Sequence, residues 1–299
     1  MSFDGTEILK IFPPEKTGWP WTEATPSLPA IMSDGSPWPK ISIVTPSFNQ
    51  AQYLEETIRS VLLQGYPNLE YIIIDGGSKD GSLEIINRYE PWLSYRISEP
   101  DLGQSHAINK GWQRATGEIV SWVNSDDWYE PGTLNKVAEY FIENPDKNIV
   151  IGDCHLVNQD DLVFDNVFNI EKGFKDIIRF WEVRSIPTQP ALFFRRKLLD
   201  IHGYLDPSLN YAMDYDLWLR FSRQNRFYHV EQFFANYRFH PGSKGGEQEW
   251  NRFIPEWKKV FRRYVGFNPG LWLIYFRIEL RSFAKRIKHK AFSNDKQTN

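Results

Sequence analysis

The chain contains almost no cysteine and no long apolar run. Cys154 is the only cysteine among 299 residues, so an internal disulfide and a cysteine-based metal cluster are excluded. No stretch of about 18 consecutive apolar residues occurs, and we therefore expect no transmembrane helix. The segment Met1–Lys10 carries acids and lacks the apolar core of a secretory signal. A single thiol is compatible with a reducing compartment, and these absences together predict a cytoplasmic protein.

Net charge and glycine motifs exclude two further classes of function. The net charge of −3 gives no general case for nucleic-acid binding. No Gly-x-Gly-x-x-Gly follows the first predicted strand, which excludes a dinucleotide oxidoreductase. What the chain does contain is 41% hydrophobic and 24% charged residues, as ordinary folded proteins do. Its 12 tryptophans and 14 tyrosines can pack a core, and such rings also form flat platforms for sugars.

Strand and helix patterns alternate through the first half of the chain. Short β-branched or apolar runs predict strands, and apolar residues at helical spacing predict the helices between them. The predicted strands are Ile41–Thr45, Tyr71–Ile74, Tyr95–Ser98 and Ile119–Val123, and the predicted helices run from about Leu54 to Gly65, Ser82 to Tyr89 and Ser105 to Ala115. This alternation predicts an α/β fold with a mostly parallel central sheet that helices cover on both faces.

The pattern continues beyond Pro131 and changes character at both ends of the chain. The later predicted elements are a helix to Glu143, strands Ile149–Asp153, Ala191–Phe194 and Phe233–Phe239, a hairpin around Asp160-Asp161, and a helix over Tyr211–Arg223. Residues 1–39 are rich in proline and tryptophan and predict an irregular arm laid over the domain, with a disordered tail as the alternative. We therefore expect an arm (1–39), a central domain (40–245) and a basic, aromatic helical extension (246–299).

Three of the predicted strands end in loops that carry acids. These acids are Asp75, Asp101 and the pair Asp126-Asp127. Because the carboxyl ends of parallel strands share one edge of a sheet, the three loops should converge there. Adjacent carboxylates repel each other unless a cation or hydrogen-bond donors lie between them, and oxygen-rich clusters suit Mg²⁺ or Mn²⁺ carrying phosphates. Asn124–Asp127 alone is equally typical of a polar turn, but the convergence of three loops favours a site.

Five segments in order resemble the motifs of inverting glycosyltransferase family 2. They are Thr45–Asn49, Asp75–Asp80, Glu99–Gln104, Asn124–Asp127 and Met213–Trp218, within a resemblance that covers roughly Pro39–Ser243. The resemblance implies a GT-A fold, with a Rossmann-like nucleotide-binding half and an acceptor-binding half. It also implies metal-dependent transfer of a sugar from a nucleotide-diphosphate sugar to a hydroxyl of a glycan or lipid-linked acceptor, as in polysaccharide biosynthesis. UDP is the commonest donor nucleotide, with GDP and dTDP as alternatives.

The resemblance assigns the donor pocket to the first half of the domain. Asp75 would accept a hydrogen bond from the edge of the base, or it could hold its own loop in an Asx-turn. Asp101 and Gln104 would complete the pocket, or they could cap the following helix. The residues expected at the nucleotide-sugar are Thr45, Pro46, Ser47, Phe48, Asp75, Asp101, Gly103, Gln104, Asn124, Ser125 and Asp127.

The segment Asn124-Ser125-Asp126 resembles the family's Asp-x-Asp metal motif, with an amide in place of the first acid. We expect Asp126 to provide most of the protein's contact with Mn²⁺ or Mg²⁺, which would neutralise the departing diphosphate. His240 resembles a late histidine that can approach the metal, and a purely structural role is the alternative. Asp127 would either support Asp126 or contact the donor sugar.

Asp214 matches the family's catalytic base, which removes the proton of the acceptor hydroxyl for in-line attack with inversion at the anomeric carbon. Asp216 is the alternative base, and either acid could instead favour the N-terminus of its helix. The acid that usually precedes the base is Met213 here. Gln189 and Trp218 lie where the acceptor is usually bound, although Trp218 suits the core equally. The loops over 164–190 and 242–250 should select the hydroxyl.

Two other functions and the role of the tail stay open at this point. A sugar nucleotidyltransferase would share the sheet, but Thr45–Gln50 lacks its glycine- and lysine-rich phosphate loop. A non-catalytic nucleotide- or sugar-binding protein on a decayed scaffold would explain Asn124 and Met213, whereas the carboxylates retained at the metal and base positions argue against it. The basic, aromatic tail Trp250–Lys290 fits either an amphipathic helix on the inner face of an anionic membrane or a helix packed on the domain.

Overall fold

The computed structural model describes residues 6–11, 15–179, 186–244, 250–266 and 269–277. Contacts between backbone positions divide the chain into two compact units, Met1–Trp257 and Lys258–Asn299. The first unit contains the sheet, its helices and the start of α9 (Trp250–Val265), and the second contains the rest of α9. The domain boundaries proposed near residues 39 and 245 stay predictions.

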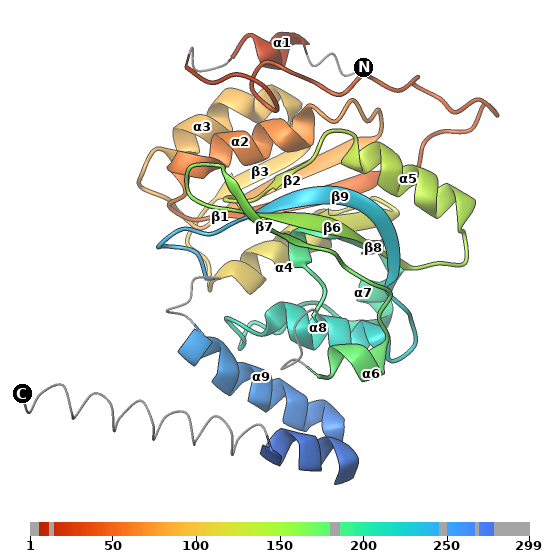
Figure 1. Ribbon diagram of the computed structural model, residues 1–299. Helices are drawn as coiled ribbons and strands as arrows, with labels where there is room; N and C mark the ends of the chain where they lie inside the picture. The colour runs from red at the N-terminus through yellow and green to blue at the C-terminus, as the bar shows by residue number, and fades with distance from the viewer. Residues whose placement is uncertain (1–5, 12–14, 180–185, 245–249, 267–268, 278–299) are drawn as a thin grey trace, which may run out of the picture. The chain divides into compact units, whose positions relative to one another are not determined.

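Four parallel strands form the first half of the sheet, in the order β3-β2-β1-β4 (Figure 1). Their bounds are β1 Ile41–Ser47, β2 Leu69–Asp75, β3 Tyr95–Ser98 and β4 Ile119–Trp122. The connecting helices are α2 Ala51–Leu62, α3 Ser82–Tyr89 and α4 Gln104–Arg114. Every residue of β1 is buried, because α2 and α3 lie over one face of the sheet and α4 lies over the other. The predicted alternation and coverage of both faces are confirmed.

The second half of the sheet mixes antiparallel and parallel pairings. β8 (Leu192–Arg195) pairs antiparallel with both β4 and β6 (Ile149–Val157). β9 (Tyr228–Arg238) pairs parallel with β6 and antiparallel with β5 (Trp128–Tyr129). β7 (Val163–Val167) returns against β6 as the predicted hairpin. Within the described ranges, nine strands therefore form one mixed sheet, and the predicted α/β class is confirmed.

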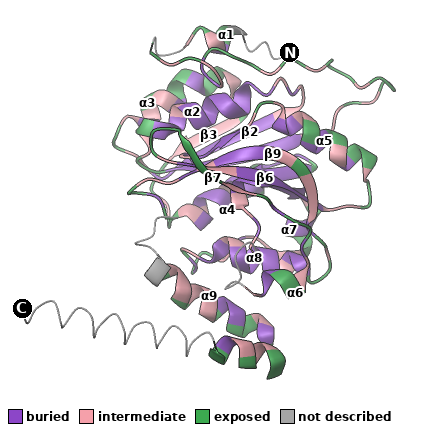
Figure 2. Ribbon diagram, viewed as in Figure 1, coloured by how far each residue is buried: buried purple, intermediate pink, exposed green. Residues whose placement is uncertain are grey.

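Aromatic side chains fill the space between the sheet and the helices on the α4 face. Trp122 of β4 lies 5.2 Å from Trp112 of α4 and 5.5 Å from Trp218 of α8, measured between ring centroids, and all three are buried. Figure 2 shows the buried residues running along the strands. Trp218 is therefore a core residue, which was one of its two predicted roles. The remaining helices and turns are α1 Thr6–Leu9, η1 Glu90–Trp92, α5 Thr133–Glu143, α6 Phe174–Ile177, η2 Gln189–Ala191, α7 Lys197–His202 and α8 Met213–Ser222.

A buried guanidinium ties the N-terminal arm to α2. Arg59 has no exposed surface, and its side chain donates to the carbonyl oxygens of Ile8, Ile11, Pro20 and Trp21 and to the Tyr89 hydroxyl. Trp19 adds a hydrogen bond from its Nε1–H to the carbonyl of Tyr129 (2.9 Å). The described part of the arm is therefore held against the domain by side-chain donors that satisfy its irregular backbone.

The smaller unit contains an aromatic cluster. Phe261 stacks on Tyr275 with 5.2 Å between ring centroids, and Trp272 donates its Nε1–H to the carbonyl of Gly266 (2.8 Å). No helix within the described residues is long and apolar enough to cross a membrane. Much of the basic charge of the tail lies outside the described residues, and membrane contact stays a prediction. These basic residues are Arg281, Lys285, Arg286, Lys288 and Lys290.

Removing the Arg59 guanidinium should release the arm and lower the stability of the fold. In Arg59→Ala, four carbonyl oxygens lose their donor, and each buried group left unpaired costs about 1–3 kcal/mol. We expect the free energy of unfolding, measured by urea titration, to fall by about 3–5 kcal/mol. Arg88→Ala is the control, because its ion pair with Glu55 is 46% exposed on the arginine side and should contribute under about 1 kcal/mol. Equal losses in both variants would contradict this role for Arg59.

Candidate active site

The segments that follow β1, β2, β3 and β4 line one cavity of about 640 Å³. Its volume suits a nucleotide-sized ligand. Phe48 offers a ring that is 61% exposed, and Ser47 Oγ is buried without a hydrogen-bond partner among the described residues. Both features are suited to a ligand, the ring by stacking and the hydroxyl by hydrogen bonding. The predicted residues that the structure brings together on this wall are Pro46, Ser47, Phe48, Asp101, Gly103, Gln104, Asn124, Ser125 and Asp126.

Asp75 does not lie on this wall. Its carboxylate is buried and accepts hydrogen bonds from the backbone N–H groups of Gly77 and Ser78 and from the hydroxyls of Ser78 and Ser98. In this arrangement Asp75 holds its own loop, and contact with a base stays a prediction. Thr45 is also buried behind the wall, where its Oγ1 lies 3.0 Å from the Tyr71 hydroxyl.

Asp101 is half-buried and lines the cavity beside the loop that Asp75 holds. Its Oδ1 accepts a hydrogen bond from the Gly103 N–H (2.7 Å). A Cβ atom at Gly76 would lie 3.0 Å from Asp101 Oδ2 and 3.1 Å from the Phe48 ring. Glycine at position 76 therefore lets the acid and the ring approach the same point on the cavity wall.

Asp126 and His240 form the candidate metal-binding pair. His240 Nε2 lies 3.0 Å from Asp126 Oδ2, and Nδ1 accepts from the Gly242 N–H (3.2 Å). This hydrogen-bond pattern assigns the ring proton to Nε2, so binding of a metal at Nε2 requires that proton to leave. The described residues contain no cluster of three or more His, Cys, Asp or Glu side chains able to hold a metal. One carboxylate and one imidazole fit Mn²⁺ or Mg²⁺ whose other ligands are phosphate oxygens.

Asn124, which replaces an acid of the family motif, is the centre of an amide network. Its Oδ1 accepts from Gln104 Nε2 (2.6 Å), and its Nδ2 donates to Asp127 Oδ2 and Gln189 Oε1 (3.1 Å each). A carboxylate at position 124 could not donate either of these last two bonds. The amide therefore suits a position between an acid and a glutamine carbonyl.

The buried cation Arg238 supports the acidic pair from behind. Its backbone N–H donates to Asp127 Oδ1 (2.9 Å), and its Nε donates to the Asp126 carbonyl (2.9 Å). Its guanidinium also pairs with Glu56 and Asp161. Burial first, and then repulsion from Asp126, raise the pKa of the Asp127 carboxyl well above its ordinary value. Asp127 is thus buried behind the cavity, where it accepts hydrogen bonds from Asn124 and Arg238, and it does not line the cavity.

A second cavity of about 220 Å³ adjoins the first and contains Asp214. Asp214 lies in the first turn of α8, and burial raises the pKa of its carboxyl to about 6, against the effect of a hydrogen bond from the Tyr215 N–H (2.7 Å). Asp216 is buried in an ion pair with Arg220 (3.0 Å) and does not line either cavity. Gln189 lines the smaller cavity, and its contact with an acceptor stays a prediction.

Three residues that the sequence did not single out line both cavities. They are Asn210, Tyr237 and Lys244. Lys244 Nζ donates to Gln104 Oε1 (2.8 Å) and to the Asn210 carbonyl (2.9 Å), so it joins the two cavities. In the sequence, Lys244 is marked only by its position in the loop over 242–250. Loop residues follow no helical or strand periodicity, so no pattern could single it out.

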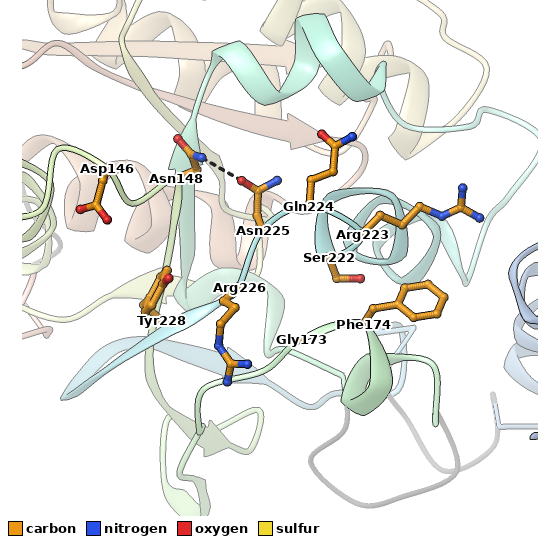
Figure 3. A pocket seen from close by; sticks show the side chains of 10 residues that line it. All are labelled: Asp146, Asn148, Gly173, Phe174, Ser222, Arg223, Gln224, Asn225, Arg226 and Tyr228. Carbon is orange, nitrogen blue, oxygen red and sulfur yellow. Dashed lines mark hydrogen bonds between the residues drawn. The ribbon is translucent and has the colours of Figure 1, made fainter.

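A third cavity, of about 380 Å³, contains none of the predicted site residues (Figure 3). Asn148 and Asn225 face each other there and form a hydrogen bond of 2.8 Å. Arg223 and Arg226 supply positive charge to its rim. The residues predicted for donor, metal and base therefore gather in the first two cavities or directly behind them.

An α/β sheet with a cavity at the carboxyl ends of its parallel strands is the arrangement of nucleotide-binding α/β proteins. The sequence model of Glycosyl transferase family 2 matches residues 42–201. An uncharacterised glycosyltransferase of Rickettsia typhi is 32% identical over 209 residues, which are 68% of this chain and 64% of that protein. The putative teichuronic acid biosynthesis glycosyltransferase TuaG of Bacillus subtilis is 38% identical over 109 residues, which are 35% of this chain and 43% of that protein.

Two solved structures share the fold. S. aureus TarS 1–349 in complex with UDP-GlcNAc has a TM-score of 0.56 at 20% identity, covering 68% of this chain and 60% of that one. The mannosyltransferase PcManGT of Pyrobaculum calidifontis in complex with GDP-Man and Mn²⁺ has a TM-score of 0.54 at 19% identity, covering 85% and 68%. The chain belongs to glycosyltransferase family 2 and has its GT-A fold, as the motifs predicted. It spans 64% of the Rickettsia typhi relative and 43% of TuaG.

Neutralising Asp214 should stabilise the fold at high pH. Its carboxyl has a pKa of about 6 in the folded chain against an ordinary 3.8, so the folded state holds the proton more tightly and stability falls as pH rises from about 4 to above 6. The difference corresponds to at most about 3 kcal/mol. In urea titrations, Asp214→Asn should be more stable than the wild type at pH 8 by about 1–3 kcal/mol, and the two should converge near pH 4.

The matched control is Asp216→Asn, which should have the opposite effect. It breaks the buried pair with Arg220, and we expect it to lower the free energy of unfolding at pH 8 by about 3 kcal/mol. Stabilisation that persists unchanged at pH 4 in Asp214→Asn would contradict the assigned pKa.

Proposed function

We propose that the chain transfers a sugar from a nucleotide-diphosphate sugar to an acceptor hydroxyl with inversion at the anomeric carbon. The observation that best supports this function is that two cavities share a wall. The larger one holds the candidate metal ligand and the smaller one holds the candidate base. The residues common to both are Gln104, Asn124, Asn210, Tyr237 and Lys244. A donor in the larger cavity and an acceptor in the smaller one would meet at this wall.

The larger cavity suits the donor nucleotide. Phe48 would stack on the base, and Ser47 Oγ would satisfy its unused hydrogen-bonding capacity there. Asp101 would accept from the base or the ribose, whereas Asp75 would reach a base only by giving up bonds to its own loop. TarS holds UDP-GlcNAc and the Pyrobaculum enzyme holds GDP-Man, and we favour UDP with GDP and dTDP as alternatives.

The diphosphate would lie beside Asp126 and His240. A divalent cation bound there would neutralise the departing diphosphate, and the Pyrobaculum enzyme is in complex with Mn²⁺ as well as GDP-Man. Asn124 contributes no charge, so Asp126 would be the carboxylate of this segment that faces the cation. Lys244 lies at the same wall and would add a positive charge on the side of the leaving group.

The smaller cavity suits the acceptor. Asp214 would accept the proton of the acceptor hydroxyl as the hydroxyl oxygen attacks the anomeric carbon and the bond to the diphosphate breaks. Its pKa of about 6 leaves it ionised at neutral pH, yet basic enough to hold that proton. Tyr211 and Phe253 add aromatic surface to the same cavity, which fits a sugar ring of a glycan or of a lipid-linked acceptor.

The proposed donor cavity is tested by measuring nucleotide binding. UDP, GDP and dTDP are each titrated into the protein, once with Mn²⁺ and once with a chelator. We expect one nucleotide to bind with a metal requirement, and Asp126→Ala to weaken that binding by at least tenfold, about 1.4 kcal/mol. Asp160→Ala, in the exposed hairpin turn, is the control and should bind as the wild type does. If no nucleotide binds under any condition, the non-catalytic alternative replaces this proposal.

The pH dependence of transfer tests Asp214 as the base. Only the ionised carboxylate can accept the hydroxyl proton, so the turnover rate should rise with pH and reach half of its plateau near the pKa of about 6. Asp214→Asn should lose at least about 100-fold in kcat, as expected for removal of a general base, while it binds the nucleotide normally. A wild-type rate that does not change between pH 5 and pH 8 would exclude this role.

A further inference from the structure

Helix α8, which carries Asp214, begins without a capping side chain of its own. Its N-cap residue is Ala212, whose side chain has no hydrogen-bond acceptor. Ala212 is also buried, so water does not readily replace the missing acceptor. The backbone that leads into the helix is held instead by a partner from elsewhere in the chain.

Glu256 of α9 is that partner. Its Oε2 accepts hydrogen bonds from the backbone N–H groups of Asn210 (3.0 Å), Tyr211 (2.7 Å) and Ala212 (3.0 Å), and its Oε1 also lies 3.1 Å from the Asn210 N–H. A carboxylate in this place satisfies several donors at once and carries the charge that a helix N-terminus favours. Position 256 lies beyond residues 42–201, the part that the family model matches.

The same contact involves Asn210, which lies in the wall between the two cavities. The Asn210 N–H donates to Glu256, and the Asn210 carbonyl accepts a hydrogen bond from Lys244 Nζ (2.9 Å). Phe253, one turn before Glu256, packs edge-on against Tyr211 with 5.0 Å between ring centroids and lines the smaller cavity. The first turns of α9 therefore contact the acceptor side of the site through the Glu256 carboxylate and the Phe253 ring.

We propose that Glu256 is a positioning residue, which caps α8 from α9 at the N–H of the N-cap residue and of the two residues before it, and so fixes Asp214 against the acceptor hydroxyl. The role in transfer rests on the proposed function, whereas the capping itself does not. Loss of the cap would let residues 210–214 shift, and a displacement of about 1 Å at a catalytic group can cost on the order of 100-fold in rate. The part of the donor cavity that is built on β1 to β4 would keep its geometry, and the change would be confined to the wall that Asn210 and Lys244 share with the smaller cavity.

The test compares Glu256→Gln with Glu139→Gln, the same substitution at a side chain that is 47% exposed in α5. The amide removes the charge and turns one acceptor into a donor facing N–H groups. Hydrogen exchange should accelerate at least about tenfold over residues 210–222 and stay unchanged over 119–127. In steady-state kinetics kcat should fall about 10- to 100-fold with the donor KM within about twofold. Glu139→Gln should change none of these quantities.

A second substitution separates capping from a general loss of structure. Glu256→Asp keeps a carboxylate that can accept from the N–H groups of residues 210–212, and we expect it to retain more of the kcat and the exchange protection than Glu256→Gln does. It also serves if Glu256→Gln alone does not fold. Unchanged exchange over 210–222 in Glu256→Gln would overturn the capping, and faster exchange with normal kcat would overturn the positioning role. A wild-type chain that transfers no sugar would refute the proposed function, and the exchange result would still decide the capping.

Discussion

The acidic edge of this sheet depends on the buried guanidinium of Arg238. It is 2% exposed, pairs with Glu56 and Asp161, and donates to the Asp126 carbonyl. Several carboxylates in one buried region would repel each other without a cation among them. Because Arg238 is the last residue of β9, the pairing of this strand with the rest of the sheet is what brings the charge there. Asp126 can then face the cavity while the other carboxylates are neutralised behind it.

Two acids of the site occupy different environments, which suits different tasks. Asp126 lies against His240 at the larger cavity, where an ionised carboxylate can hold a cation. Asp214 lies in the smaller cavity among apolar and aromatic side chains, and burial raises its pKa to about 6. The proposed transfer needs both properties, a charged ligand and a base of moderate strength. Their separation follows from the mixed sheet, in which β1 to β4 build one cavity and the segment before α8 builds the other.

Much of the fold and part of the site follow from local patterns in the sequence. Apolar runs such as Ile119–Val123 form strands because their residues are buried on both faces. Parallel strands present their carboxyl ends at one edge of a sheet, and this rule was enough to predict that Asp101 and Asp126 lie at one cavity. Local patterns could not predict that the later strands would add antiparallel pairs, because pairing partners such as β4 and β8 are far apart in the chain.

The sequence by itself determined the alternating elements, the family and the acidic edge, since these depend on short-range periodicity and on motifs. Only the tertiary structure decided which acids face a cavity. Asp75 turns inward to donors of its own loop and Asp216 to Arg220, whereas Asp214 faces a cavity. It also joined Glu256 to Ala212, 44 residues away, and Arg238 to Glu56, 182 residues away. Such contacts depend on how packed elements meet, and no local period in the chain encodes them.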